Sequence, residues 1–221
     1  MDTFFEKIYI INLSSRKDKW NHIVNEMKKL NITEYQRFDA IRPKTFDDIP
    51  YDYYKNIRKV LHRNKNYIIG AMGCKLSHYT IIKEAKEMNY NRILILEDDV
   101  FFEKNFHSTF NNILKQINEN DLQWDMIYLG QNLKDYEKVK NISNLVKTKR
   151  AFCTHSYMIN SSFYDVVLNN CLKSGIEIDN FYNSLFLNYN CFCIKPYLTN
   201  QKPGYSDIVS GYRNYITGRV N

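Results

Sequence analysis

The sequence has 221 residues, 44% of them hydrophobic, and a formal net charge of +7. This length suits one well-cored domain, and the hydrophobic content excludes a wholly disordered chain. No apolar stretch approaches the roughly 20 residues that cross a bilayer, and the N-terminus lacks the basic and apolar regions of a secretory signal. We therefore expect residues 1–221 to form a single domain of a soluble, intracellular protein without a membrane span.

The first half of the chain alternates between strand and helix patterns. An apolar run at 7–13 predicts a buried strand, and apolar residues at helical spacing over 20–30 predict a helix after it. Residues 35–40 predict a second, short strand. The long polar and aromatic segment 41–67 is expected to contain a helix near 53–62.

The second half continues this alternation. Gly70 and Gly73 open a helical pattern that runs to Asn89, and the apolar segment 92–97 predicts the next strand. Beyond it we expect a helix and three strands, at 106–117, 125–130, 151–160 and 191–198. The Lys- and Asn-rich segment 131–150 is expected to be an exposed loop. This order of elements predicts an α/β fold with a mostly parallel sheet flanked by helices.

The five cysteines are an odd number, and none has the CxxC spacing of a zinc motif. Cys191 and Cys193 flank Phe192, as two residues on the same side of a strand do. We expect all five to be reduced thiols, most of them small core residues, and we expect no zinc site.

Three acidic residues, Glu97, Asp98 and Asp99, end the apolar strand that looks most deeply buried. In open α/β sheets, ligands bind beyond the carboxyl ends of the strands. Adjacent carboxylates repel one another and burial adds to their cost, whereas a hard divalent cation such as Mg²⁺ or Mn²⁺ relieves both. The alternative is a solvated strand end whose acids stabilise the following helix.

Strand geometry refines the metal hypothesis. Residues two apart face the same side of a strand, so Glu97 and Asp99 are expected to point together. Asp99 is the predicted direct metal ligand, and Glu97 is predicted to act through a water or a sugar hydroxyl. Asp98 points away unless the chain turns there.

Three sequence blocks in this order resemble glycosyltransferase family 25, which contains lipopolysaccharide-type and collagen galactosyltransferases. They are INLSSRKDKW at 11–20, GAMGCKLSH at 70–78 and LEDDV at 96–100. The later stretches SYMIN, IDNFY and QKPGYSDI also resemble blocks of this family. Two departures leave the donor sugar open: many members have an acid just before GC, where this chain has Ala71-Met72, and the second basic residue of the first block is Lys19.

The resemblance implies a GT-A fold, in which a Rossmann-like sheet binds a nucleotide-sugar donor and a divalent metal at an acidic motif. The segment 97–99 occupies the place of that motif, and Mn²⁺ or Mg²⁺ is the implied metal. The candidate metal ligands are Glu97, Asp99 and Asp207. The candidate donor-binding residues are Asn12, Leu13, Arg16, Asp39, Gly73, Ser77, His78, Asp98, Gln201 and Ser206.

These donor-binding candidates have structural alternatives. The segment from Asn12 to Arg16 can hold a nucleobase through its backbone and a phosphate through the guanidinium, or it can simply cap a helix. Ser77 and His78 can hydrogen-bond the uridine or diphosphate, or His78 can be an ordinary buried histidine. Asp39 can bind the base or ribose, or it can shape a turn.

The later part of the chain supplies candidates for the acceptor side. Asp179, in IDNFY, is the predicted general base that deprotonates the acceptor hydroxyl as it attacks the anomeric carbon, and its alternative role is a helix N-cap. His155 either lines the pocket or hydrogen-bonds within the sheet. Gln201, Ser206 and Asp207 are expected to close over the diphosphate or to complete the metal shell.

The predicted activity is inverting transfer of a hexose or N-acetylhexosamine from a UDP-sugar to a hydroxyl of a glycan or glycoprotein. Two alternatives stay open: a degenerate transferase that binds sugar nucleotide without turnover, and a basic nucleic-acid-binding module. The basic residues are scattered rather than clustered with aromatics, so nucleic acid is not the expected partner. A nucleotidyltransferase of the same architecture is disfavoured because INLSSRKDKW has no glycine for a phosphate-binding loop.

Overall fold

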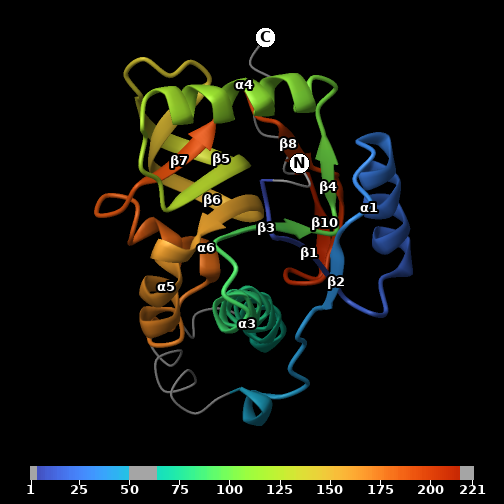
Figure 1. Ribbon diagram of the computed structural model, residues 1–221. Helices are drawn as coiled ribbons and strands as arrows, with labels where there is room; N and C mark the ends of the chain where they lie inside the picture. The colour runs from blue at the N-terminus through green and yellow to red at the C-terminus, as the bar shows by residue number, and fades with distance from the viewer. Residues whose placement is uncertain (1–3, 50–63, 215–221) are drawn as a thin grey trace.

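A computed structural model describes residues 4–49 and 64–214, so the helix expected near 53–62 lies outside the described residues. A six-stranded sheet runs through the centre in the order β2-β1-β3-β6-β5-β7 (Figure 1). Its strands are β1 (Lys7–Asn12), β2 (Gln36–Asp39), β3 (Arg92–Glu97), β5 (Met126–Lys138), β6 (Leu145–Asn160) and β7 (Cys191–Ile194). Strand β1 is parallel to β2 and β3, and β5 is parallel to β7, whereas β6 runs antiparallel to β3 and β5. Every strand of this sheet except β6 shares one direction.

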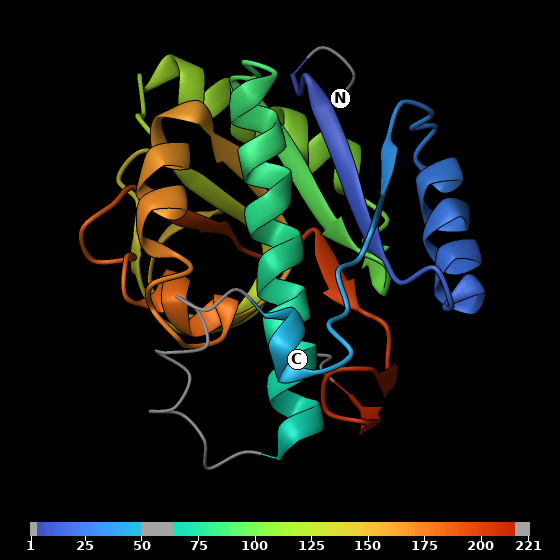
Figure 2. The same cartoon turned by 90° about the horizontal axis from the view of Figure 1, so that it is seen from below.

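Helices cover both faces of the sheet (Figures 1 and 2). They are α1 (Lys17–Lys29), α3 (Lys65–Glu87), α4 (Phe106–Glu119), α5 (Tyr164–Asn170) and α6 (Ile178–Asn183), with 3₁₀ turns at Phe46–Asp48 and Ser161–Phe163. The mostly parallel sheet flanked by helices is therefore confirmed. Within 4–49 and 64–214, no helix has both the length and the apolar character needed to cross a bilayer.

Two apolar clusters, one on each face, explain why β1 and β3 are continuous apolar runs. Ile8 and Ile10 pack with the apolar faces of α1 and α4, whereas Tyr9 and Ile11 pack with α3, α5 and α6. Successive strand residues point to opposite faces, so a strand buried on both sides carries apolar residues at every position. The parallel pairing of β1 with β3 places their carboxyl ends side by side, with Ile11 opposite Glu97.

The prediction of an exposed loop at 131–150 is wrong. Strand β5 continues to Lys138 and β6 begins at Leu145, so this segment is a long antiparallel hairpin in which Tyr136 pairs with Thr148. Irregularities in the pairing register break the alternation of polar and apolar residues, and the outward-facing lysines give the segment the composition of a loop.

The prediction that glycines open the third helix is also wrong. Helix α3 begins at Lys65, where the Asn64 side chain accepts a hydrogen bond from the Tyr67 amide at 2.8 Å. The glycines lie inside the helix because other segments approach it closely. A Cβ at Gly73 would lie 2.3 Å from the Ile41 carbonyl oxygen, and one at Gly70 would lie 2.9 Å from the Ile208 Cα.

Gly73→Ala is expected to destabilise the fold by about 1–3 kcal/mol, because the added methyl overlaps backbone that must move. In a helix interior, alanine is normally more stabilising than glycine. A lower free energy of unfolding for Gly73→Ala would therefore reflect the steric overlap. Gly204 is the matched control, since a Cβ there meets nothing within 4 Å. Urea unfolding of the two variants measures the difference. A Gly73→Ala protein as stable as Gly204→Ala would contradict the close approach.

Two small sheets complete the molecule near the carboxyl end of β3. Strand β4 (Val100–Phe102) pairs with β8 (Thr199–Gln201), and β9 (Gly204–Ser206) pairs with β10 (Gly211–Arg213). The first pairing places Gln201 opposite Val100, directly beside the acidic residues. A late segment of the chain therefore meets one from its middle at this edge of the sheet.

Candidate functional site

A cavity of about 450 Å³ lies at the carboxyl edge of β1 and β3. Helix α3 and the start of α6 contribute to its lining, and so does the segment that follows β9. Most of the residues singled out in the sequence line it, namely Leu13, Ser77, Glu97, Asp98, Asp99, Asp179, Gln201, Ser206 and Asp207. The fold thus brings together side chains that are far apart in the sequence.

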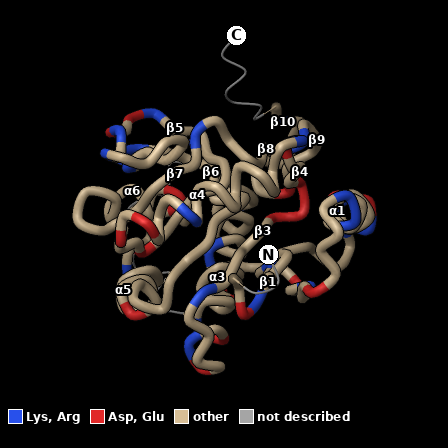
Figure 3. Tube along the Cα trace, turned by 45° about the horizontal axis from the view of Figure 1, so that its top comes forward, with Lys and Arg blue, Asp and Glu red and all other residues tan. Residues whose placement is uncertain are grey.

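The acidic residues occupy a tight turn, since β3 ends at Glu97 and β4 starts at Val100 (Figure 3). Asn12 donates its Nδ2 hydrogen to Asp98 Oδ2 at 2.7 Å. Lys19 Nζ lies 3.4 Å from Asp98 Oδ1 and 3.3 Å from Asp99 Oδ2. One ammonium group therefore faces two carboxylates.

Glu97 and Asp99 converge on one amide group. Gln201 Nε2 lies 3.5 Å from Glu97 Oε2 and 3.3 Å from Asp99 Oδ1. The other oxygen of Glu97, Oε1, faces α3, where it lies 3.5 Å from His78 Nε2 and 4.0 Å from Cys74 Sγ. The Glu97 carboxylate is therefore shared between two groups of side chains, one on each side.

Burial and neighbouring charges shift the pKa values of Asp98 and Glu97 in opposite directions. Burial raises the pKa of Asp98 to about 6, although Lys19 acts in the opposite direction. Burial acts to raise the pKa of Glu97 as well, but the contact with His78 outweighs it and the pKa lies below its usual value. Burial would lower the pKa of Lys19, yet Asp99 and Asp98 raise it, which keeps the ammonium charged.

The side chains of this turn fit a hard divalent cation. Three carboxylates lie at the turn, and the ammonium group of Lys19 contacts only two of them, so negative charge remains uncompensated. The Asn12 Oδ1 and Gln201 Oε1 atoms are buried and have no hydrogen-bond partner within the described residues. Carboxylate and amide oxygens are the ligands that Mg²⁺ and Mn²⁺ prefer.

A second charged pair joins the N-terminal segment to the C-terminal one. Arg16 Nη1 donates to Asp207 Oδ2, and the Arg16 guanidinium lies 6.0 Å from the Tyr205 ring centre. Arg42 Nη1 adds a 3.3 Å contact to the Asp207 carbonyl oxygen. Asp207, predicted as a metal ligand, is thus paired with the arginine that was predicted to bind phosphate.

Asp179 lies in the first turn of α6 and faces the cavity. Its Oδ1 accepts the Asn180 amide hydrogen at 2.8 Å, and its Oδ2 lies 3.5 Å from the amide nitrogen of Cys153. Cys153 has a φ of 69°, an unusual conformation for a residue with a side chain. Burial raises the pKa of Asp179, which favours proton acceptance at that carboxylate.

Some predicted residues lie outside the cavity lining. Asp39 is directed to solvent, with its side chain 75% exposed and 3.6 Å from Arg37, and Gly73 packs against Ile41. His155 is buried in β6 and does not line the cavity. The other predicted residues outside the lining act from behind it, as Asn12 contacts Asp98, Arg16 contacts Asp207 and His78 contacts Glu97.

Lys19 is a site residue to which the sequence reasoning gave no role. Its side chain is only 16% exposed, although it lies on a helix that carries several solvent-facing charges. The neighbouring residues carry no signal of this role, because the partners of Lys19, Asp98 and Asp99, lie in the turn after β3.

Comparison with known proteins assigns the chain to a family. Residues 5–182 match the sequence model described as glycosyltransferase family 25 (LPS biosynthesis protein). The chain belongs to glycosyltransferase family 25. The resemblance expected from the three sequence blocks is therefore confirmed.

Relatives of this family 25 chain include both galactosyltransferases and an inactive protein. It is 28% identical over 163 residues to human procollagen galactosyltransferase 2 and 30% identical over 164 residues to procollagen galactosyltransferase 1-A of Xenopus laevis. Each alignment covers 70% of this chain and 26% of the relative. The human inactive glycosyltransferase 25 family member 3 is 25% identical over 197 residues, which cover 82% of this chain and 32% of that protein. The chain thus spans about a quarter to a third of the length of these relatives.

Solved structures match only loosely. The crystal structure of A197 from STIV aligns with a TM-score of 0.47 and 12% identity over 97% of this chain and 96% of that one. A glucose-1-phosphate thymidylyltransferase from Bacillus anthracis, named as putative, aligns with a TM-score of 0.44 and 11% identity over 85% of each chain.

Proposed function

We propose that this chain is a single GT-A domain, spanning residues 1–221, that transfers a hexose or N-acetylhexosamine from a UDP-sugar to a hydroxyl of a glycan or glycoprotein. The observation that carries the proposal is the acidic turn at the end of β3, which faces a cavity that also exposes Asp179. Family membership supports the reaction class, and the names of the galactosyltransferase relatives support a sugar-nucleotide donor.

The acidic turn is proposed to hold the donor through a divalent cation, Mn²⁺ or Mg²⁺. Asp99 is the assigned direct ligand, with Glu97 beside it and Asp98 held in place by Asn12. When bound, the cation would neutralise the negative charge of the departing diphosphate. Arg16 contacts Asp207 from behind the cavity lining and is proposed to bind a phosphate group in exchange for this contact.

Asp179 is proposed to take the proton from the acceptor hydroxyl. Backbone amides of Asn180 and Cys153 hold both carboxylate oxygens, which fixes their orientation toward the cavity. The proposed reaction is inverting: the deprotonated acceptor oxygen attacks the anomeric carbon directly, from the side opposite the departing diphosphate.

A donor screen tests the proposed function. UDP-glucose, UDP-galactose, UDP-N-acetylglucosamine and GDP-sugars are supplied with Mn²⁺ or with EDTA, and nucleotide release and donor binding are both measured. We expect one UDP-sugar to bind and to release nucleotide in the presence of Mn²⁺. In EDTA we expect neither binding nor release. Donor binding that persists unchanged in EDTA would contradict the proposed role of the metal.

A second candidate function is donor binding without turnover. It is favoured by the inactive human relative, which aligns over 82% of this chain. The same screen separates the two, because a degenerate protein would bind a UDP-sugar with Mn²⁺ yet release no nucleotide with any acceptor.

A further inference from the structure

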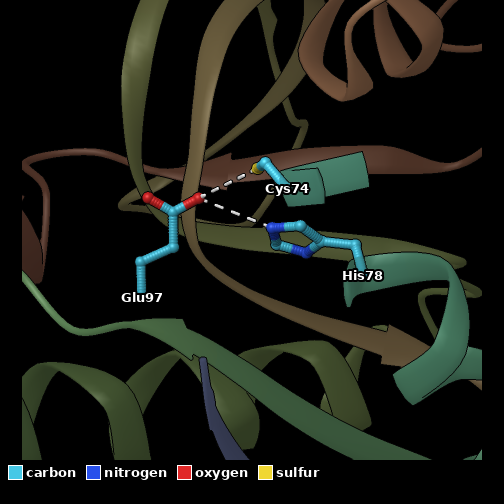
Figure 4. Close-up of side chains that lie close together, drawn as sticks. All are labelled: Cys74, His78 and Glu97. Atoms are coloured by element: carbon cyan, nitrogen blue, oxygen red, sulfur yellow. Dashed lines mark hydrogen bonds and ion pairs between the residues drawn. The ribbon is translucent and has the colours of Figure 1, made fainter. Parts of the chain in front are cut away.

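Three side chains with metal-binding atoms meet between α3 and the end of β3. Cys74 and His78 are four residues apart on α3 and therefore project from the same face of the helix. Figure 4 shows both of them directed at one oxygen of Glu97. The sulfur of Cys74, a ring nitrogen of His78 and this oxygen all lie within 4.8 Å of one another.

The separations are close to those of a tetrahedral metal site. Zinc bonds of about 2.3 Å to sulfur and about 2.1 Å to nitrogen and oxygen place neighbouring ligand atoms roughly 3.4–3.6 Å apart. Here His78 Nε2 lies 3.5 Å and Cys74 Sγ lies 4.0 Å from Glu97 Oε1. Small side-chain rotations would bring all three atoms to bonding distance of one ion.

His78 is oriented as a metal-binding histidine is. Its Nδ1 lies 2.8 Å from the hydroxyl of Tyr157, which is itself 3.3 Å from the hydroxyl of Tyr182. Its Nε2 is fully buried and has no hydrogen-bond partner within the described residues. A metal ion bound by both Nε2 and Glu97 Oε1 would replace their direct contact, with Nδ1–H donating to Tyr157 as histidine ligands of metals commonly donate their second N–H.

We propose that Cys74, His78 and Glu97 form a binding site for a borderline-soft divalent ion of the Zn²⁺ or Co²⁺ class. Mixed sulfur, nitrogen and oxygen ligands select such ions over Mg²⁺. Cys74 and Glu97 both line the cavity, so a fourth ligand can reach the ion from there. Binding replaces the thiol proton of Cys74, which is released to solvent as the sulfur–metal bond forms.

This site is separate from the hard-cation position proposed for the donor. Glu97 uses Oε1 toward Cys74 and His78, and Oε2 toward Gln201 and the acidic turn. The assignment stands on these three side chains and does not depend on the proposed transfer reaction. The spacing of the cysteines in the sequence predicted no zinc site, because here the third ligand comes from a different element, the strand after α3.

Titration of the full chain with Co²⁺ tests the site. We expect a sulfur-to-cobalt charge-transfer absorption that saturates at one equivalent and disappears when Zn²⁺ displaces the cobalt. Cys74→Ser is expected to lose this absorption. Cys153→Ser is the matched control, since Cys153 is also a half-buried thiol of the same cavity, and it should retain the absorption. Tyr157→Phe should weaken Zn²⁺ binding by about 10- to 100-fold.

Two outcomes would overturn the site. One is a wild-type chain that shows no sulfur-to-cobalt absorption, a result that does not depend on whether any variant folds. The other is an absorption that survives Cys74→Ser. Asp99→Asn separates this proposal from the proposed function, because it should keep the cobalt signal while it loses Mn²⁺-dependent donor binding.

Discussion

Asp99→Asn should abolish Mn²⁺-dependent donor binding and lower sugar transfer by about 10³-fold or more, since a metal contributes several kcal/mol of charge stabilisation at a leaving phosphate. Asp99 lies in the turn after β3, with Lys19 Nζ and Gln201 Nε2 both at 3.3 Å. The substitution keeps the size of the side chain and removes one of the repelling charges. We therefore expect the thermal midpoint to stay the same or to rise slightly.

Glu103→Gln is the matched control for this experiment. Glu103 follows β4 and accepts a hydrogen bond from Asn200 at 2.8 Å, so it is an acid of the same region that does not line the cavity. Isothermal titration with the UDP-sugar, with and without Mn²⁺, measures binding. Equal losses in both variants would indicate a general effect of charge, and undiminished binding in Asp99→Asn would refute the assigned ligand.

Asp179→Asn should lower transfer by about 10²- to 10⁴-fold, the usual contribution of a general base, while donor affinity changes little. An asparagine oxygen can still accept a hydrogen bond from the Asn180 amide, so the start of α6 should keep its conformation. What is lost is the basic carboxylate, whose pKa burial raises. Single-turnover transfer and donor binding, measured on the same preparation, separate the two effects.

Glu177→Gln is the comparison for this base. Glu177 also lines the cavity, and its carboxylate accepts hydrogen bonds from Tyr67 and Asn180, each at 3.0 Å. We expect Glu177→Gln to retain far more transfer than Asp179→Asn. The reverse order would reassign the base to Glu177. Full transfer in both variants would show that neither carboxylate acts as the base.

The sequence was sufficient for the sheet because β1 and β3 are buried on both faces and therefore stand out as apolar runs. It also located the acidic turn, since charged residues at the end of such a strand have few structural explanations. The hairpin after Gly130 was missed because bulges interrupt its alternation. A strand is recognised in a sequence by its alternation of polar and apolar residues, and a shift in the pairing register interrupts that alternation.

Contacts between distant segments explain the remaining differences at the site. The positions of Gly70 and Gly73 inside α3 depend on Ile208 and Ile41, which approach the helix from other parts of the chain. The role of Lys19 depends on the turn after β3, and the outward direction of Asp39 depends on where β2 ends at the edge of the sheet. None of these relations has a signature in neighbouring residues.

The joining of the chain's early and late segments has a consequence for biosynthesis. A ribosome delivers the N-terminal strands first, and the central sheet has all its strands once Ile194 has emerged. Gln201 and Asp207 follow later, so the nascent protein passes through a stage in which the sheet can form while the acidic turn and Arg16 still lack these contacts. The contacts that complete this edge of the sheet thus form only after the strands of the sheet itself have been made.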